Sequence, residues 1–290
     1  MIKRFHMASI FDDVVQKLQI SYSEVRSAPL TDTSQLLTGY VHTLDKGSAI
    51  FITDDLKPFL IPIECVLYYK LQTGDHIQAK VNYSSEYNNY VVTDIINVEH
   101  VHYEDAIAIK SNRTIDILSN SIFLGTSVLL PVTDNQDITT KVAQILSTLP
   151  ADVMPILLSF DGRPTNFNVP TAYFTKPDYY SREKLMTCLQ TFFYAKQQAD
   201  KGKHIILIID SLDKMFTAFN GCMQKAGLID PNLYSSAAVT DYENILCSSR
   251  ALDKSGSLTI IGLHHQGTSP QMIQISDRLT QILDAVLTTK

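Results

Sequence analysis

The strongest constraint on the fold comes from two short segments that carry almost no polar residue, 205–209 (IILII) and 258–263 (LTIIGL). A strand with one face in water alternates apolar and polar residues, whereas a strand with helices packed on both faces is apolar throughout. Neither segment alternates. The two segments therefore predict buried strands of a parallel sheet that has helices on both sides.

Strand and helix patterns alternate around these two segments from about Ile115 onwards, which is typical of a parallel sheet. The helix expected at Ser181–Lys201 has the clearest signals, because its apolar residues form one stripe and Gly202 follows as a stop. The other expected helices are Thr139–Leu149 and Asp241–Leu252, and the expected strands are Ser127–Val132, Met154–Phe160, His204–Asp210 and Ser257–Leu263.

The preceding part of the chain follows another pattern. Gly39–Ile52 has the residues of a hairpin around Asp45-Lys46-Gly47. Further short strands are expected at Phe59–Ile63, His76–Val81 and Tyr90–Val98. Short strands with Gly and Asn turns at this spacing predict a small β-barrel.

These patterns divide the chain into three expected parts. Residues 1–35 form a short helical segment and a linker, with apolar residues at helical spacing in Ile10–Leu18. Residues 36–102 form the barrel. Residues 103–290 form the domain with the parallel sheet.

Composition limits the classes of function. The chain has 290 residues, of which 45% are hydrophobic, so it can fill one large core or two smaller ones. A net charge of −6 opposes non-specific attraction to a polyphosphate backbone. No segment reaches the ~18 to 20 apolar residues of a membrane span, and Met1–Phe11 lacks the apolar region of a secretory signal. We therefore expect a cytoplasmic protein with no membrane partner.

Cysteine and histidine residues give no predicted metal site. The four cysteines are widely spaced, with no CxxC pair, and we expect buried free thiols rather than zinc ligands or disulfides. Glu99, His100 and His102 could place two imidazoles on one strand face, but no third ligand is signalled. His264-His265 ends a strand, where it either lines a pocket or caps it.

Polar residues follow three of the expected strands. Ligands of parallel sheets collect at the carboxyl ends of the strands, so these residues meet at one edge if the strands are neighbours. An aspartate that closes an apolar strand, such as Asp210, holds magnesium in P-loop ATPases. Many strands also end in Asp because the following turn uses a side-chain acceptor. Both interpretations of Asp210 stay open at this point.

The loop after the first strand of this domain argues against a phosphate site. A phosphate cradle needs glycines, whose amides can turn inward, and a lysine that reaches the terminal phosphates. The chain has Asp134, Asn135, Gln136 and Asp137 instead. Carboxylates at a helix N-terminus suit the helix dipole, but they occupy the place of a phosphate and repel it. We interpret these residues as a helix cap.

Four segments, in order along the chain, resemble the bacterial transcription termination factor Rho family. Leu71–Asp75 (LQTGD) is close to the family's LRTGD, and Ile206–Asn220 (ILIIDSLDKMFTAFN) fits the family pattern without a gap. Ala226–Leu233 (AGLIDPNL) is similar to GGVDANAL, and Gly256–Ile261 (GSLTII) is identical to its counterpart. The resemblance runs from about Gly39 to the C-terminus. It implies an OB-fold or cold-shock-like barrel, a RecA-like P-loop-type domain, and an RNA-dependent ATPase that forms rings.

Departures from the family affect three parts of the ATPase. An ungapped comparison places Asp137 and Ile138 at the phosphate-loop glycine and lysine, and retains only Thr139. The glutamate that activates the attacking water becomes Gly162, and Thr289 stands at the arginine that acts on the neighbouring subunit's nucleotide. Because each part positions or stabilises the transferred phosphoryl group, we predict no useful ATP hydrolysis. The expected degenerate pocket consists of Asp137, Ile138, Thr139, Asp161, Gly162, Arg163, Asp210 and Ser211.

Aromatic residues of the expected barrel are candidates for stacking on RNA bases. Phe59 and Tyr90 fall where the family places stacking tyrosines, although both could instead belong to the barrel core. Tyr83, Tyr87 and Tyr90 lie along a polar hairpin and are better candidates for an exposed platform. Residues 39–99 contain four lysines and eight carboxylates, a net charge of −4, which predicts weak binding at physiological salt.

The sequence thus predicts a Rho-like, RNA-associated pseudo-ATPase that acts in or modulates transcription termination through RNA binding or subunit assembly. Its expected partners are single-stranded RNA and further copies of this chain or of an active Rho, and no cofactor is expected. Two alternatives stay open. One is a divergent, active ATPase in which Asp161 and Asp210 manage magnesium for ATP, and the other is a structural interaction protein without RNA affinity.

Overall fold

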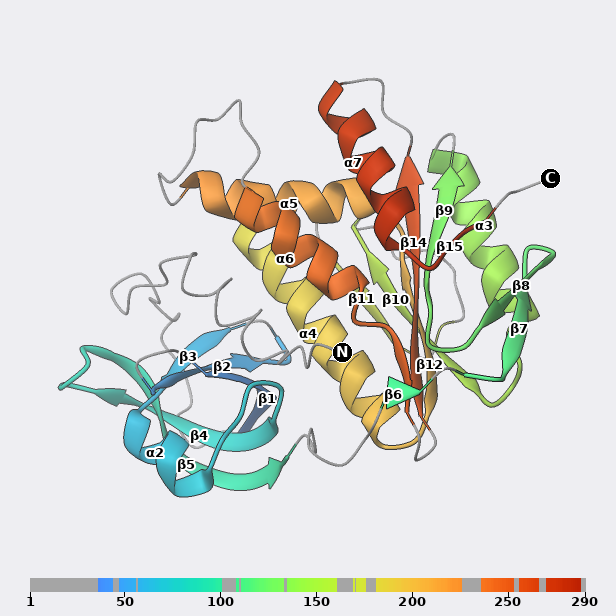
Figure 1. Cartoon of the computed structure of the whole chain (residues 1–290). Coiled ribbons are helices and arrows are strands. Elements are labelled where there is room, and N and C mark those ends of the chain that lie inside the picture. The colour runs from blue at the N-terminus through green and yellow to red at the C-terminus, as the bar shows by residue number, and fades with distance from the viewer. Residues whose placement is uncertain are drawn as a thin grey trace. The chain divides into compact units, whose positions relative to one another are not determined.

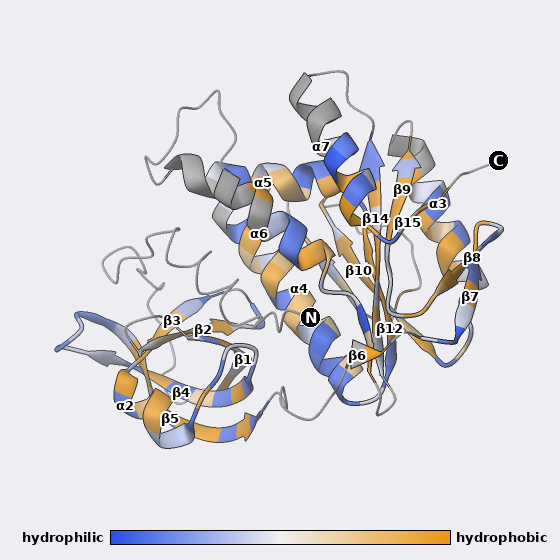
Figure 2. Cartoon of the chain, in the orientation of Figure 1, coloured by the Kyte–Doolittle hydropathy of each residue, from blue (hydrophilic) through white to orange (hydrophobic). Residues whose placement is uncertain are grey.

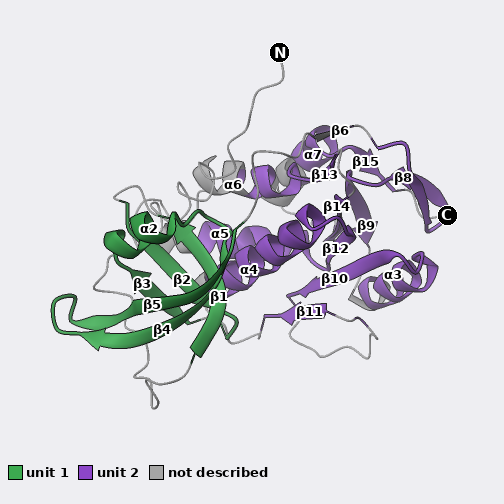
Figure 3. Ribbon diagram, turned by 90° about the horizontal axis from the view of Figure 1, so that it is seen from below, with its two compact units in different colours: residues 1–101, 223–233 green, residues 102–222, 234–290 purple. Residues whose placement is uncertain are grey.

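The structure is a computed structural model of the chain. It describes residues 36–43, 47–55, 57–100, 108–109, 111–132, 135–160, 169, 171–175, 181–225, 236–252, 256–265 and 270–287. The chain forms two compact units (Figure 3), the barrel unit of residues 1–101 and 223–233 and the sheet unit of residues 102–222 and 234–290. The helix expected at Ile10–Leu18 lies outside the described residues.

The barrel unit contains a closed five-stranded barrel, which confirms the prediction. Around the barrel the order is β1-β2-β3-β5-β4, and the helix α2 (Ile63–Tyr69) separates β3 from β4 in the chain. A small closed barrel of this kind has the architecture of the OB-fold. The strands are β1 (Leu36–Thr43), β2 (Ala49–Thr53), β3 (Pro58–Ile61), β4 (His76–Ser84) and β5 (Asn89–Glu99).

Alternate residues of the barrel strands fill its interior. Val41 pairs with Phe51, and Phe51 pairs with Phe59, so that one row of buried side chains crosses three strands. The ring centroids of Phe51 and Phe59 lie 6.4 Å apart, within the range in which aromatic rings attract each other. Phe59 therefore helps to hold the barrel together from inside.

The sheet unit is built around an eight-stranded sheet, most of which is parallel (Figure 1). The predicted parallel sheet is therefore confirmed. Two short antiparallel strands, β13 (Arg250–Leu252) and β6 (Ala108–Ile109), extend it beside the first residues of β14. The parallel strands, in spatial order, are β11 (Thr171–Phe174), β10 (Val153–Ser159), β12 (His204–Ile209), β14 (Ser257–His265), β9 (Ser127–Val132) and β15 (Ala285–Val286).

Helices cover both faces of this sheet, as the apolar strands predict. On one face, α3 (Asn135–Thr148) joins a buried apolar cluster with alternate residues of the strands. On the other face, α4 (Ser181–Asp200) contacts β10, β11, β12 and β14 (Figure 1). Figure 2 shows the apolar colour concentrated on the central strands. The burial of both faces explains why 205–209 and 258–263 contain so few polar residues.

Two helices differ from their predicted bounds. α3 begins at Asn135 rather than Thr139. The helix expected at Asp241–Leu252 is α6 (Ser236–Leu246), and the last three residues of the expected range form β13 instead. Residues 250–252 form a strand because Arg250 and Ala251 pair with β14, and Ala251 and Leu252 pair with β6. Tertiary pairing of this kind overrides a local helical pattern.

The remaining described elements are two helices and a hairpin, and the sequence patterns do not predict them. They are α5 (Leu212–Lys225), α7 (Pro270–Ile282), β7 (Thr114–Ile117) and β8 (Asn120–Phe123). Among the helices that the structure describes, none combines the length and the hydropathy that crossing a bilayer requires.

Candidate functional site

The carboxyl ends of the parallel strands form the edge where a ligand is expected. β12, which leads into Asp210, lies beside β10, as the sequence interpretation requires. β9, which leads into the phosphate-loop position, is not a neighbour of β12, because β14 lies between them. The residues that would hold a nucleotide are therefore spread over β9, β12 and the intervening end of β14.

Asp210 is held by the neighbouring strand. Its Oδ1 accepts a hydrogen bond from the Phe160 amide at 2.8 Å, and its Oδ2 accepts one from the Ser159 hydroxyl at 2.5 Å. Its own amide donates to the Leu158 carbonyl at 3.1 Å. The side chain is only 5% exposed. The carboxylate thus joins the ends of β10 and β12, with both oxygens occupied by donors of the same chain.

The environment of Asp210 favours its neutral form. Burial raises the pKa of this carboxyl group to about 6, although the hydrogen bonds from Ser159 and Phe160 lower it. The hydrogen bonds offset only part of the cost of burying the charge.

The phosphate-loop position is occupied by a helix and by the core. Only residues 133 and 134 separate the end of β9 from the start of α3. Asp137 already lies in the first turn of α3, and Thr139 is exposed. Ile138, which stands where the family has its lysine, is 7% exposed and packs with Val142 and Ile145 in the core. Glycines that would let the backbone curl around a phosphate are absent from Asp134–Asp137.

Ser211 and the residues beside it close the same edge. The Ser211 hydroxyl accepts a hydrogen bond from the Lys214 amide at 3.2 Å, which caps α5. Asp213 Oδ2 accepts one from the His265 amide at 2.9 Å. Residues 210, 211 and 213 thus each serve to join or start elements of the fold.

His264 lies inside the unit, so it does not line an open pocket. Its ring is nearly fully buried, and its Nε2 lies 2.5 Å from the Ser276 hydroxyl on α7. Its Nδ1 lies 2.9 Å from Asp213 Oδ1, but the ring N–H does not point at that oxygen well enough for a hydrogen bond. The sequence did not single out Asp213 or Ser276, because only the fold brings α5, β14 and α7 together.

Several predicted pocket residues lie outside the described part of the chain. These are Asp161, Gly162, Arg163 and Thr289, together with the side chain of Asp137. The proposed losses of the general base and of the arginine therefore stay predictions.

Three tyrosines lie on the hairpin between β4 and β5, and two of them are in contact. Tyr83 pairs with Tyr90 across the two strands, and their rings contact edge to face at a centroid distance of 5.6 Å. The Tyr83 hydroxyl donates to Asn88 Oδ1 at 2.5 Å, which fixes the ring. Tyr83 is 55% exposed and Tyr87 is 36% exposed, whereas Tyr90 is half-buried. The hairpin therefore presents aromatic surface to solvent.

Phe59 does not belong to this exposed surface. It is fully buried in the barrel interior, so the candidate role in RNA stacking is wrong for this residue and its alternative as a core residue is confirmed. The reason is register, because Phe59 faces the same side as Val41 and Phe51.

The outer face of β2 and β3 carries the apolar residues Ile50, Ile52 and Leu60, which alternate with the interior residues of these strands. OB-folds bind oligonucleotides on this face and on the loops beside it. Here the outward residues Ile50, Ile52 and Leu60 are at most 5% exposed. Of the barrel lysines, Lys57 pairs with Asp55 at 2.6 Å and Lys80 lies 3.9 Å from Asp94. Two of the described barrel lysines thus lie close to carboxylates.

The histidine and cysteine predictions have mixed outcomes. His100 Nδ1 lies 3.1 Å from the buried carboxylate of Asp75, so its described partner lies within the barrel. Among the described residues, no group of three possible ligands could hold a metal ion. Cys188 is a buried free thiol, as expected, but Cys247 is exposed, which corrects the prediction for that residue.

Comparisons with known proteins support the fold. No family model matches the sequence, and no curated protein is similar to it. The fold is similar to a prototypical ATPase from the type III secretion system of pathogenic bacteria, with a TM-score of 0.54 and 16% identity over 67% of this chain and 63% of that one. It is also similar to the assembled ATPase EscN from the type III secretion system of enteropathogenic E. coli, with a TM-score of 0.54 and 17% identity.

The comparison with these structural neighbours bears on the fold of this chain and not on its activity. The chain spans 63% and 54% of their lengths, and the match to EscN covers 69% of this chain. At this level of identity the comparison shows a small barrel followed by a RecA-like α/β domain. The comparison thus shows the fold alone, and a relationship to Rho stays a proposal.

Proposed function

We propose that this chain is a Rho-like, catalytically inactive RecA-fold protein that acts in or modulates transcription termination, through RNA binding by its barrel and through subunit assembly. The geometry of Asp210 carries the first part of this proposal. Each carboxylate oxygen of Asp210 accepts a hydrogen bond within the sheet, from Ser159 and from Phe160, which supports a role in the fold. The core position of Ile138 supports the same conclusion.

ATP hydrolysis by the purified protein tests the inactive site. We expect no phosphate release above background with magnesium and oligo-C RNA, because neither a phosphate cradle nor a lysine is available. A fluorescent ATP analogue should likewise show no micromolar, magnesium-dependent binding. RNA-stimulated hydrolysis that Asp210→Asn abolishes would overturn the proposal and support the divergent ATPase. Asp210→Asn suits this test because an amide can keep both hydrogen bonds.

The tyrosine hairpin supports the RNA part of the proposal. Stacking on an aromatic ring contributes about 1 to 3 kcal/mol per base and tolerates any base. Tyr83 and Tyr87 offer exposed rings beside the loop that OB-folds use for oligonucleotides. The same barrel carries an excess of carboxylates, so stacking rather than charge must supply most of the affinity.

Binding of an oligo-C strand at two salt concentrations tests this part. We expect weak binding at low salt that decreases as salt rises, with Tyr83→Ala and Tyr87→Ala each reducing affinity about fivefold or more. Tyr68→Ala is the matched control, because Tyr68 is 80% exposed but lies on α2, away from the hairpin in the chain. Absence of binding at low salt would remove RNA from the proposal and favour a structural interaction protein.

Assembly is tested by light scattering, because the proposal requires the chain to join a ring of copies or of active subunits. The protein is sized alone and then mixed with an active Rho from the same cell. A mixed complex, or inhibition of the active ring's ATPase, is the expected result. A protein that stays monomeric and leaves the active ring unchanged would contradict regulation through assembly.

A further inference from the structure

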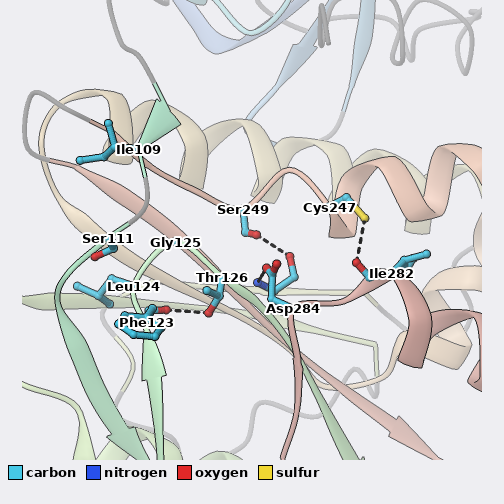
Figure 4. Close-up of a pocket in the computed structure, with 11 residues that line it drawn as sticks. Ile109, Ser111, Phe123, Leu124, Gly125, Thr126, Cys247, Ser249, Ile282 and Asp284 are labelled. Atoms are coloured by element: carbon cyan, nitrogen blue, oxygen red, sulfur yellow. Dashed lines mark hydrogen bonds between the residues drawn. The ribbon is translucent and has the colours of Figure 1, made fainter. Parts of the chain in front are cut away.

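A cavity of about 370 Å³ opens at the amino end of the parallel sheet (Figure 4). It lies within the sheet unit, beside Ser127 at the start of β9 and Asp284 just before β15. The residues of the degenerate nucleotide pocket lie at the opposite ends of the strands. This volume is in the range of small-molecule sites in other proteins.

One wall of the cavity is apolar and partly open to solvent. Phe123 and Ile109 line it and are 43% and 47% exposed. Leu124 and Ile282 line it as well. Apolar side chains that remain exposed in a concave site give a ligand a surface to bury.

The hydroxyl groups on the polar side of the cavity already donate their hydrogen bonds to acceptors within the chain. The Ser127 hydroxyl donates to the Leu246 carbonyl, so the Ser249 hydroxyl, 2.6 Å away, donates to Ser127. The Thr126 hydroxyl donates to the Phe123 carbonyl at 2.7 Å. Ser111 and Cys247 also donate within the chain, to Arg113 and Ile282. What these side chains can still offer a ligand is lone pairs.

Asp284 adds a negative charge to this set of acceptors. Its Oδ2 accepts a hydrogen bond from the Ser127 amide at 2.7 Å, and the residue is exposed. Among the described lining residues there is no lysine, arginine or histidine. A carboxylate forms its strongest hydrogen bonds with a charged donor.

We propose that this cavity is a binding site for a small molecule that has a protonated amine or amidine group and an apolar body. The cationic group would donate to Asp284 and to the Ser249 hydroxyl, and the apolar body would lie on Phe123 and Ile109. The described lining side chains offer acceptors and a negative charge, which disfavour a carboxylate or phosphate ligand. The site is independent of the RNA and nucleotide proposals.

The charge preference is tested with benzamidine and benzamide, which share a shape and differ in charge. Titration of the full chain should show benzamidine binding about tenfold more tightly or better than benzamide. Asp284→Asn should remove this difference while keeping the acceptor for the Ser127 amide. Asp277→Asn is the matched control, since it removes an exposed carboxylate from α7 outside the cavity and should keep the difference.

The position of the ligand is tested by alkylation of Cys247 with N-ethylmaleimide, followed by mass spectrometry of the labelled peptides. Burial, with the carboxylates of Glu243 and Asp284, raises the pKa of this thiol, so labelling is followed at a pH of roughly 8 or above. Benzamidine should slow labelling of Cys247 and leave Cys65 of the barrel unchanged. Equal affinity for the two probes, a preference that survives Asp284→Asn, or unprotected Cys247 would each overturn the proposal.

Discussion

The two ends of the parallel sheet hold their carboxylates in different ways. At the carboxyl end, Asp210 is buried with neutral donors, Ser159 and the Phe160 amide. At the amino end, Asp200 is paired with two cations, Lys196 at 3.0 Å and Arg250 at 2.9 Å. Asp284, also at the amino end, stays exposed beside a cavity.

This difference bears on whether a chain with this fold can carry out the activity expected of it. In a working RecA-like ATPase the carboxyl end must offer charge to magnesium and phosphate. Here the described residues at that end, Asp210 among them, form hydrogen bonds within the sheet unit, whereas charged pairs and an open cavity are found at the other end.

Asp200→Asn is expected to have the largest effect on this comparison. The substitution leaves Lys196, which is 3% exposed, without its counter-ion. Burial and the charge of Arg250 already lower the pKa of Lys196 to about 8. Breaking a buried ion pair costs about 3 to 5 kcal/mol, so the urea midpoint should fall steeply. Asp152→Asn, which breaks an exposed pair with Arg113, is the control and should leave the midpoint unchanged.

Asp210→Asn should act in the opposite direction. An asparagine can accept from the Phe160 amide and donate to Ser159, without the cost of burying a charge. The pKa of Asp210 is raised from 3.8 to about 6 in the folded state, so its ionisation destabilises the fold above pH 6. We expect stabilisation of about 3 kcal/mol at most at pH 7, measured by urea unfolding.

The pH dependence of the stability difference between Asp210→Asn and the wild type serves as the control for this prediction. A raised carboxyl pKa means that the folded state binds a proton between about pH 4 and pH 6 that the unfolded state has lost. In the wild-type protein, the contribution of Asp210 to folding stability is therefore favourable at low pH and is lost as the pH rises through 6. The advantage of Asp210→Asn should vanish near pH 4. A substitution that destabilises equally at pH 4 and pH 7 would show that the carboxylate is needed in ionised form.

Asp284→Asn should have the smallest effect on stability. Asp284 is exposed, and the amide oxygen of asparagine can accept the Ser127 hydrogen bond. Surface substitutions of this kind change stability by less than about 0.5 kcal/mol. Thermal unfolding of the variant should match the wild type. A loss as large as that of Asp200→Asn would make Asp284 a structural residue and remove the contrast between the two ends.

The sequence predicts the fold better than the site, for physical reasons. Apolar segments and alternating patterns indicate which residues are buried, and the sheet and the barrel form by burying these residues. β12 and β14 are therefore predicted nearly to their ends. β13 is missed because its strand conformation depends on partners in β14 and β6. α2 is missed because a helix of seven residues gives too short a period to recognise.

Site residues are harder to predict because their roles depend on direction. The position of Phe59 in the chain matches a stacking residue, but strand register turns its ring inward. The aspartate at 210 fits either a magnesium ligand or a turn residue, and only its bonds to β10 distinguish them. The cavity beside Asp284 combines β6, β8 and β9 with the end of α7, which lies about 140 residues further along the chain. No local pattern could have indicated it.

The burial of Ile138 makes the change at the phosphate loop hard to reverse. Lysine at this position would bring an ammonium group into a cluster that contains Val142 and Ile145, with no counter-ion among those neighbours. A working loop would first require α3 to begin later and Ile138 to leave the core. On the proposed relationship to Rho, each single step from Ile138 back towards a lysine therefore costs stability.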